Sequence, residues 1–155
     1  MRLAAAAALS LLAGCVPPGT IKGYEGPARS SDELGTVLTD MRSDTFIVTD
    51  NEITAVDGVR FEKRGYTAQL LPGVHRIGLR GTLRVSRQVR VQYCTFELNV
   101  DAGCAYRPSI PSYPRDALDQ PADADWRVTR AMTVIAECSE ASYALQLPID
   151  CSARP

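Results

Sequence analysis

Histidine is nearly absent from this 155-residue chain, in which His75 is the only one. The chain also has no C-x-x-C spacing, so the usual ligand set of a structural zinc site is missing. A G-x-S-x-G motif is missing too, which argues against a serine-hydrolase arrangement. His75 alternates with Ile77 and Leu79, so we expect it to face the core as a hydrogen-bonded structural residue. The sequence therefore predicts no catalytic residue, no metal site and no cofactor.

Aromatic residues make up only 6% of the chain, and most of them are in phase with the predicted core. A carbohydrate site built from stacked, exposed aromatic rings is therefore not expected. The formal net charge of -1 gives no bias toward nucleic acid. Apolar residues at 45% and charged residues at 23% are typical of a globular protein. At this length we expect one folded domain with one core.

The chain also lacks an apolar run long enough to cross a bilayer, but it begins with another hydrophobic pattern. Arg2 precedes an apolar segment that ends at Gly14 and has the length of a secretory signal. Leu-Ala-Gly leads directly to Cys15, and this resembles the lipobox of bacterial lipoproteins. The resemblance implies that residues 1–14 are removed and that Cys15 carries a lipid anchor, which several acyl chains make effectively permanent. Val16 replaces the Asp that retains such proteins in the inner membrane, so we expect the outer membrane, facing the periplasm.

The remaining cysteines are even in number and lie in a compartment that permits disulfides. They are Cys94, Cys104, Cys138 and Cys151. A turn at residues 101–103 would leave Cys94 about 20 Å from Cys104 along paired strands, whereas a disulfide needs Cα atoms within about 7 Å. We therefore expect two disulfides, with Cys94 bonded to Cys138 or Cys151 and Cys104 bonded to the other.

Short runs of β-branched and aromatic residues, separated by turn residues, fill most of the chain. We expect strands over 46–49, 53–56, 66–71, 75–80, 83–93, 94–100, 104–107, 126–138 and 143–151. No long helical pattern accompanies them. This pattern predicts an all-β fold, an antiparallel β-sandwich of about seven short strands with little helix.

The domain organisation follows from composition. Residues 1–14 are the predicted signal peptide, and the Pro- and Gly-rich residues 15–30 form a lipidated N-terminus and flexible tether. Residues 31–155 form a single β-sandwich domain. Within it, residues 108–125 contain four prolines and four aspartates, which indicates a surface loop.

Individual residues mark the expected strand ends. Asp57-Gly58 is a strong hairpin turn signal. Gly81 is expected to end one strand, and a change of apolar phase after Tyr93 predicts a bulge. Residues 101–103 predict a tight turn. The segment from residue 143 to residue 151 predicts an edge strand.

Several motifs together resemble those of a group of small proteobacterial lipoproteins with PEGA-like β-sandwich domains. These are Gly23-Tyr24-Glu25-Gly26-Pro27, Ile53-Thr54-Ala55-Val56-Asp57-Gly58, Leu70-Leu71-Pro72-Gly73-Val74-His75-Arg76-Ile77, Ala102-Gly103-Cys104-Ala105-Tyr106 and a late Trp126. The resemblance covers most of residues 15–135. It implies a β-sandwich fold and an envelope location, and it assigns no catalytic residue to this chain.

Charge is distributed unevenly along the chain. Residues 60–90 contain eight basic residues and one acid, whereas the loop at 108–125 is acidic. Alternation places Arg76 and Arg80 on one strand face, and Arg84 and Arg90 on the polar face of the next. Adjacent strands would array these four as an anion-binding surface, because the guanidinium group matches phosphate and carboxylate geometry. The alternative is a solvated outer face that the acidic loop partly neutralises.

Three functions fit these observations. The first is a non-catalytic, outer-membrane-anchored lipoprotein that acts as a structural or interaction module, attached to the membrane through the lipid on Cys15. The second is a binding protein for an anionic envelope ligand, either lipid phosphate or peptidoglycan carboxylate, held by the arginine face. The third is a periplasmic enzyme inhibitor. Nucleic acid is not an expected partner.

Overall fold

The computed structural model describes residues 19–43, 47–85, 88–110 and 126–155. Across these residues the regular structure consists of β-strands alone, which confirms the all-β class. The strands are β1 (Thr20–Lys22), β2 (Gly35–Leu38), β3 (Met41–Ser43), β4 (Ile47–Val56), β5 (Val59–Gly65), β6 (Thr67–Leu70), β7 (Gly73–Val85), β8 (Gln88–Val100), β9 (Ala105–Ser109), β10 (Arg127–Glu137) and β11 (Ser142–Ser152).

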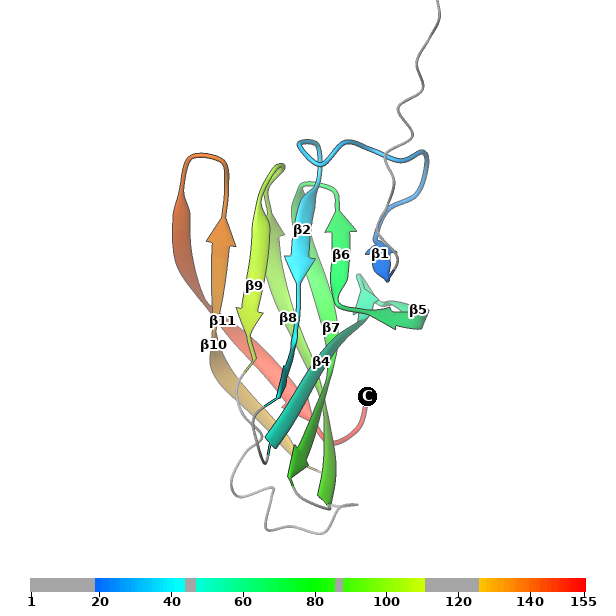
Figure 1. Ribbon diagram of the computed structural model, residues 1–155, viewed down its shortest axis with the longest axis vertical. Helices are drawn as coiled ribbons and strands as arrows, with labels where there is room; N and C mark the ends of the chain where they lie inside the picture. Colours follow the sequence, from blue (N-terminus) through cyan, green and yellow to red (C-terminus); the bar gives the residue numbers. More distant parts are fainter. Residues whose placement is uncertain (1–18, 44–46, 86–87, 111–125) are drawn as a thin grey trace, which may run out of the picture.

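All eleven strands belong to one sheet, so the predicted sandwich of about seven strands is wrong. The order is β1-β6-β2-β9-β10-β11-β8-β7-β4-β3, and β5 pairs with β4 outside this order. The β1–β6 and β2–β9 contacts are parallel, and the other pairs are antiparallel. Strand twist coils a sheet this wide, and here it curls into a nearly closed, barrel-like shape (Figure 1).

The curled sheet comes closest to closing where β5 meets β1. A Cβ atom on Gly65 would clash with the carbonyl oxygen of Gly19, so the two backbones touch. Alternation along a strand shows which residues face a core, but it does not show whether one curled sheet or two stacked sheets enclose that core. The sequence pattern therefore could not predict whether the strands form one sheet or two.

The core lies inside the curl. Its fully or nearly fully buried apolar residues are Ile21, Leu34, Val37, Ile53, Val56, Ala68, Leu70, Ile77, Leu79, Phe96, Leu98, Val100, Tyr106, Met132, Val134, Ala136 and Ile149. The expected inward positions of Ile77 and Leu79 are confirmed. The buried Tyr106 hydroxyl accepts a hydrogen bond of 2.8 Å from the backbone N–H of Asp101, so this polar atom is satisfied.

The β7–β8 hairpin corrects two expectations. Gly81 does not end a strand, and no bulge follows Tyr93, because the register runs unbroken from Gly73 opposite Val100 to Val85 opposite Gln88. The inward phase therefore continues through a polar residue, Gln92, which is buried. A Cβ atom on Gly81 would lie 3.0 Å from the Gln92 side chain, so the glycine makes room for it. The register shift lies instead in β4, between Ile53 and Ala55.

The two predicted disulfides are present. Cys94 of β8 bonds to Cys151 of β11, which lies directly opposite in the register. Cys104 bonds to Cys138 beside the β9–β10 pair. The disfavoured Cys94–Cys104 bond does not form, because β11 and β10 separate β8 from β9 in the sheet. The sequence predicted that β11 is an edge strand, but it is an interior strand because it pairs with β10 on one side and β8 on the other.

The ends of the predicted segments also change. Residues 20–22, assigned to the tether, form β1, and Thr20 lies opposite Thr67 of β6. The predicted Asp57-Gly58 turn is confirmed, with positive φ angles of 51° and 81° that fit a type I′ hairpin.

Cys15 and residues 111–125 lie outside the described residues. In the described part, no helix is long and apolar enough to span a membrane.

Candidate functional site

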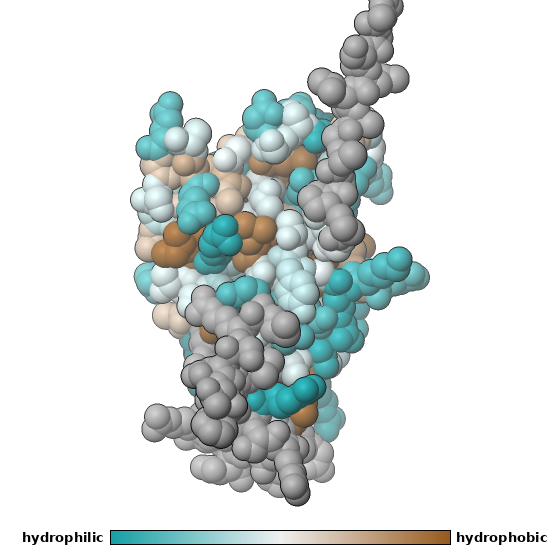
Figure 2. All heavy atoms as spheres, viewed as in Figure 1, coloured by the Kyte–Doolittle hydropathy of each residue, from teal (hydrophilic) through white to brown (hydrophobic). Residues whose placement is uncertain are grey.

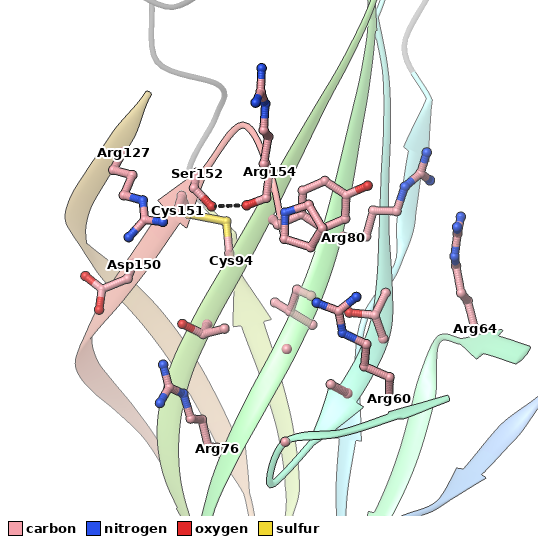
Figure 3. Close-up of a pocket in the computed structure, with 18 of the residues that line it drawn as sticks. Arg60, Arg64, Arg76, Arg80, Cys94, Arg127, Asp150, Cys151, Ser152 and Arg154 are labelled. Carbon is pink, nitrogen blue, oxygen red and sulfur yellow. Dashed lines mark hydrogen bonds between the residues drawn. A yellow bond between two sulfur atoms is a disulfide. The ribbon is translucent and has the colours of Figure 1, made fainter. Parts of the chain in front are cut away.

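A groove of about 840 Å³ opens on the face of the sheet opposite the core (Figure 3). Its floor comes from β4, β7, β8, β10 and β11, and β5 and the segment after β11 line its sides. Thr54, Ala55, Gly78 and Thr95 contribute small side chains, or none, to the lining. The apolar part includes Phe61. The groove therefore combines small and apolar lining residues with charged residues from both its floor strands and its sides.

Arginine is the dominant charged residue of the groove. Its lining includes Arg60, Arg64, Arg76, Arg80, Arg127 and Arg154. Arg60 and Arg64 come from β5 on one side, and Arg127 comes from β10 on the other (Figure 3). Elements far apart in the sequence thus bring cations to one cavity.

Strand alternation explains why Arg76 and Arg80 reach the groove. Both flank Gly78 on β7, and the residues between them, Ile77 and Leu79, point into the core. Side chains on alternate residues point to opposite faces of a sheet, so the two arginines must project outward. Gly78 between them packs closely against β4, because a Cβ there would lie 3.0 Å from the Cβ of Ala55.

Two acidic side chains lie beside these arginines. Glu52 accepts hydrogen bonds from Arg64 at 3.2 Å and from Arg80 at 3.3 Å. Asp150 accepts a 2.5 Å hydrogen bond from the hydroxyl of Thr129. The groove therefore has an excess of positive charge even after these carboxylates are counted.

Three of the arginines are available for a ligand. Within the part of the chain that the structure describes, the guanidinium groups of Arg60, Arg76 and Arg127 form no ion pair or hydrogen bond. Arg60 and Arg76 are exposed, as is Arg127. An incoming anion therefore does not have to displace a carboxylate of these described segments from any of the three.

The segment after β11 is held in place by short-range hydrogen bonds. The hydroxyl of Ser152 donates to the carbonyl oxygen of Arg154 at 2.5 Å (Figure 3). The backbone N–H of Ala153 donates to the carbonyl oxygen of Trp126 at 3.1 Å. Together with the Cys94–Cys151 disulfide, these bonds fix the side of the groove that carries Arg154.

An Asp57–His75 pair fixes the backbone of Arg76. The Asp57 carboxylate lies 2.7 Å from His75 Nδ1 and accepts a 2.8 Å hydrogen bond from the Arg76 N–H. His75 Nε2 lies 2.8 Å from the carbonyl oxygen of Leu71, so both ring nitrogens are engaged, as expected for a structural histidine. Burial acts to raise the pKa of the Asp57 carboxyl, but the hydrogen bonds from Arg76 and His75 outweigh it, and the pKa lies below its ordinary value.

The structure brings together only part of the predicted arginine set. Arg76 and Arg80 line the groove, and Arg84 is on the same face but outside it. Arg90 is opposite Leu83 in the register and lies on the inward face, because β8 has no bulge. The prediction that all four arginines share one face is therefore wrong for Arg90, and only Arg76 and Arg80 line the groove.

Four groove arginines were missed by sequence reasoning. They are Arg60, Arg64, Arg127 and Arg154. The excess of basic residues over residues 60–90 could have indicated Arg60 and Arg64. The other two depend on the β10–β11–β8 register, which places Arg127 opposite Ser152, and Ser152 opposite Tyr93. No local pattern encodes that pairing.

Among the described residues there is no group of three or more His, Cys, Asp and Glu side chains with the spacing of a metal site. Comparison of the chain with protein-family models, curated proteins and solved structures finds no match. The resemblance to PEGA-like lipoproteins stays a prediction.

Proposed function

We propose that this protein is a non-catalytic binding protein that holds an anionic ligand in the arginine groove. The observation that carries the proposal is a set of three guanidinium groups around one cavity, on Arg60, Arg76 and Arg127, which have no partner among the described residues. A guanidinium group donates in a planar geometry that matches two oxygens of a phosphate or carboxylate. Partial enclosure strengthens such contacts, because less water screens the charges than at an open surface.

The proposal includes a location in the cell envelope. A lipid on Cys15 would hold the chain on the outer membrane, facing the periplasm. Lipid phosphates and peptidoglycan carboxylates are the anions at hand there. The groove supports this ligand-binding function over a purely structural or interaction module, because a concave, cationic cavity is suited to a small anionic group and not to a flat protein surface.

Calorimetric titration with inorganic pyrophosphate tests the proposal. We expect Arg76→Glu and Arg127→Glu each to weaken binding by at least tenfold, because a hydrogen bond to a charged group contributes about 1.5–3 kcal/mol. Arg84→Glu is the matched control, since Arg84 is on the same sheet face but outside the groove. Binding should also weaken steeply with salt.

Equal affinity of all three variants and the unmodified chain would contradict the proposal. A second titration with glutarate, a dicarboxylate, separates the two ligand chemistries. Tighter binding of pyrophosphate indicates phosphate recognition, and tighter binding of glutarate indicates carboxylate recognition.

A further inference from the structure

Strand β5 projects from the sheet. Its register with β4 includes Val59, Arg60 and Gly65, so residues 61–64 form an unpaired stretch that bulges out between the two paired ends of the strand. Figure 1 shows β5 pointing away from the curled sheet, and Figure 2 shows a hydrophilic projection at the same place. A strand that leaves its sheet presents its side chains to whatever surface lies beside the protein.

The composition of β5 suits an anionic surface. Arg60, Lys63 and Arg64 carry positive charge against one acid, Glu62. Val59 is an apolar side chain that is 63% exposed. Arg60 and Arg64 line the groove, whereas Lys63 and Val59 do not. The strand therefore has one set of side chains for the groove and a second set available to another surface.

The short connection to Cys15 places β5 near the membrane. Gly65 at the end of β5 touches the backbone of Gly19, which directly precedes β1. Only three residues separate Gly19 from Cys15, and the four Cα-to-Cα steps between them span at most about 14 Å when fully extended. When the lipid on Cys15 is in the bilayer, the base of β5 is within that distance of the bilayer surface.

We propose that β5 is a membrane-docking element, in which Lys63 and Val59 contact the anionic surface of the bilayer that holds the lipid anchor. This inference depends on the anchor included in the proposed function. Lys63 supplies attraction to lipid phosphates, and Val59 supplies an apolar contact at the headgroup level. Docking orients the domain, so that the groove beside β5 opens close to the membrane.

Hydrogen exchange of the lipidated mature chain in vesicles tests this proposal. We compare vesicles of phosphatidylcholine alone with vesicles that also contain phosphatidylglycerol. Docking predicts that the amides of residues 61–64 exchange about fivefold more slowly on the anionic vesicles, the effect expected of one basic residue near an anionic surface. Lys63→Glu should abolish the difference. Arg84→Glu, a charge reversal at an exposed residue of β7, should leave it unchanged.

Exchange at the same rate on both vesicles, or protection that survives Lys63→Glu, would overturn the inference. Absence of lipid on Cys15 by mass spectrometry would also overturn it. Titration of the same variants with pyrophosphate separates this failure from failure of the groove. Lys63→Glu should retain the affinity for pyrophosphate, whereas Arg76→Glu should lose that affinity and keep the protection of β5.

Discussion

His75 Nδ1 lies 2.7 Å from Asp57 Oδ2, and the contact joins a strand to the turn between two others. Asp57 begins the type I′ turn after β4, and His75 is near the start of β7. The other ring nitrogen lies 2.8 Å from the carbonyl oxygen of Leu71. Both neighbours of the ring are hydrogen-bond acceptors. The pair thus connects a turn, a loop and the strand that carries Arg76.

Replacing His75 with alanine should lower stability without changing which ligand is bound. Its side chain is only 12% exposed, and its loss removes the hydrogen-bond contacts to the Leu71 carbonyl oxygen and to Asp57 Oδ2. We expect a loss of about 1–3 kcal/mol in the free energy of unfolding. Urea unfolding measures this change. A variant that kept full stability but lost a defined activity would show that the structural interpretation is wrong.

The Asp57 carboxyl predicts a specific loss of stability in acid. Its pKa is lowered in the folded state, so its contribution is fully present above the unfolded pKa of about 3.9 and is lost as the pH falls through the lower, folded value. Asp57→Asn keeps a side-chain oxygen for the Arg76 N–H and tolerates the positive φ. It should therefore reduce the difference in unfolding free energy between about pH 5 and pH 3.

Other carboxyl groups contribute to the same acid transition and make the comparison with Asp57→Asn necessary. A hydrogen bond from the Ser30 side chain is the main cause that lowers the pKa of Asp32 and of Glu33, and both carboxyl groups are fully exposed. Their part of the transition should remain in Asp57→Asn. If the variant and the unmodified chain lose stability in parallel down to about pH 3, the assignment to Asp57 is wrong.

The disulfides predict two losses of stability with different consequences for the groove. The bridges close loops of 57 and 34 residues, for which the chain-entropy model gives about 4 kcal/mol each, slightly more for the longer loop. Urea unfolding of the Cys94→Ala/Cys151→Ala and Cys104→Ala/Cys138→Ala double variants measures both. Only the first should also weaken pyrophosphate binding, because Cys94 and Cys151 line the groove. Equal affinity of both double variants would show that this bridge does not support the groove.

Sequence patterns predicted the β class and most strands because burial imposes a two-residue period on a strand. They also predicted the Asp57-Gly58 turn, where positive φ angles restrict the residue types. They failed where a polar residue occupies an inward position. Gln92 is buried opposite Gly81, and its polarity falsely indicated a phase change and a bulge.

The site was less predictable than the fold because it depends on long-range pairing. Arg76 and Arg80 could be grouped from alternation alone, since both lie on β7. Arg127 joins them only because β10 pairs with β11, and β11 with β8. The cysteines contained part of this information, because bonding Cys94 to Cys151 implies that β8 and β11 are neighbours. The sequence left that pairing open between Cys138 and Cys151.

Glu52 offers the sharpest test of the electrostatics of the groove, because it competes with a ligand for two arginines. It accepts hydrogen bonds from Arg64 and Arg80 and is only 19% exposed. Glu52→Gln keeps the shape of the side chain and removes its negative charge. We expect pyrophosphate to bind about tenfold more tightly at low salt, because a partly buried charge close to the site no longer repels it. Stability should fall by about 1–3 kcal/mol, since two charge-assisted hydrogen bonds are weakened.

Glu137→Gln is the matched control for this change. Glu137 also pairs with an arginine, Arg107, at 3.3 Å, but both are largely exposed and neither lines the groove. Its neutralisation should leave the affinity for pyrophosphate unchanged and alter stability by less than about 1 kcal/mol. The difference between the two variants should disappear at high salt, where screening removes the effect of a nearby charge. If Glu52→Gln instead weakens binding, then the carboxylate positions Arg64 and Arg80 for the ligand. In that case, the loss of this positioning lowers the affinity by more than the loss of charge repulsion raises it.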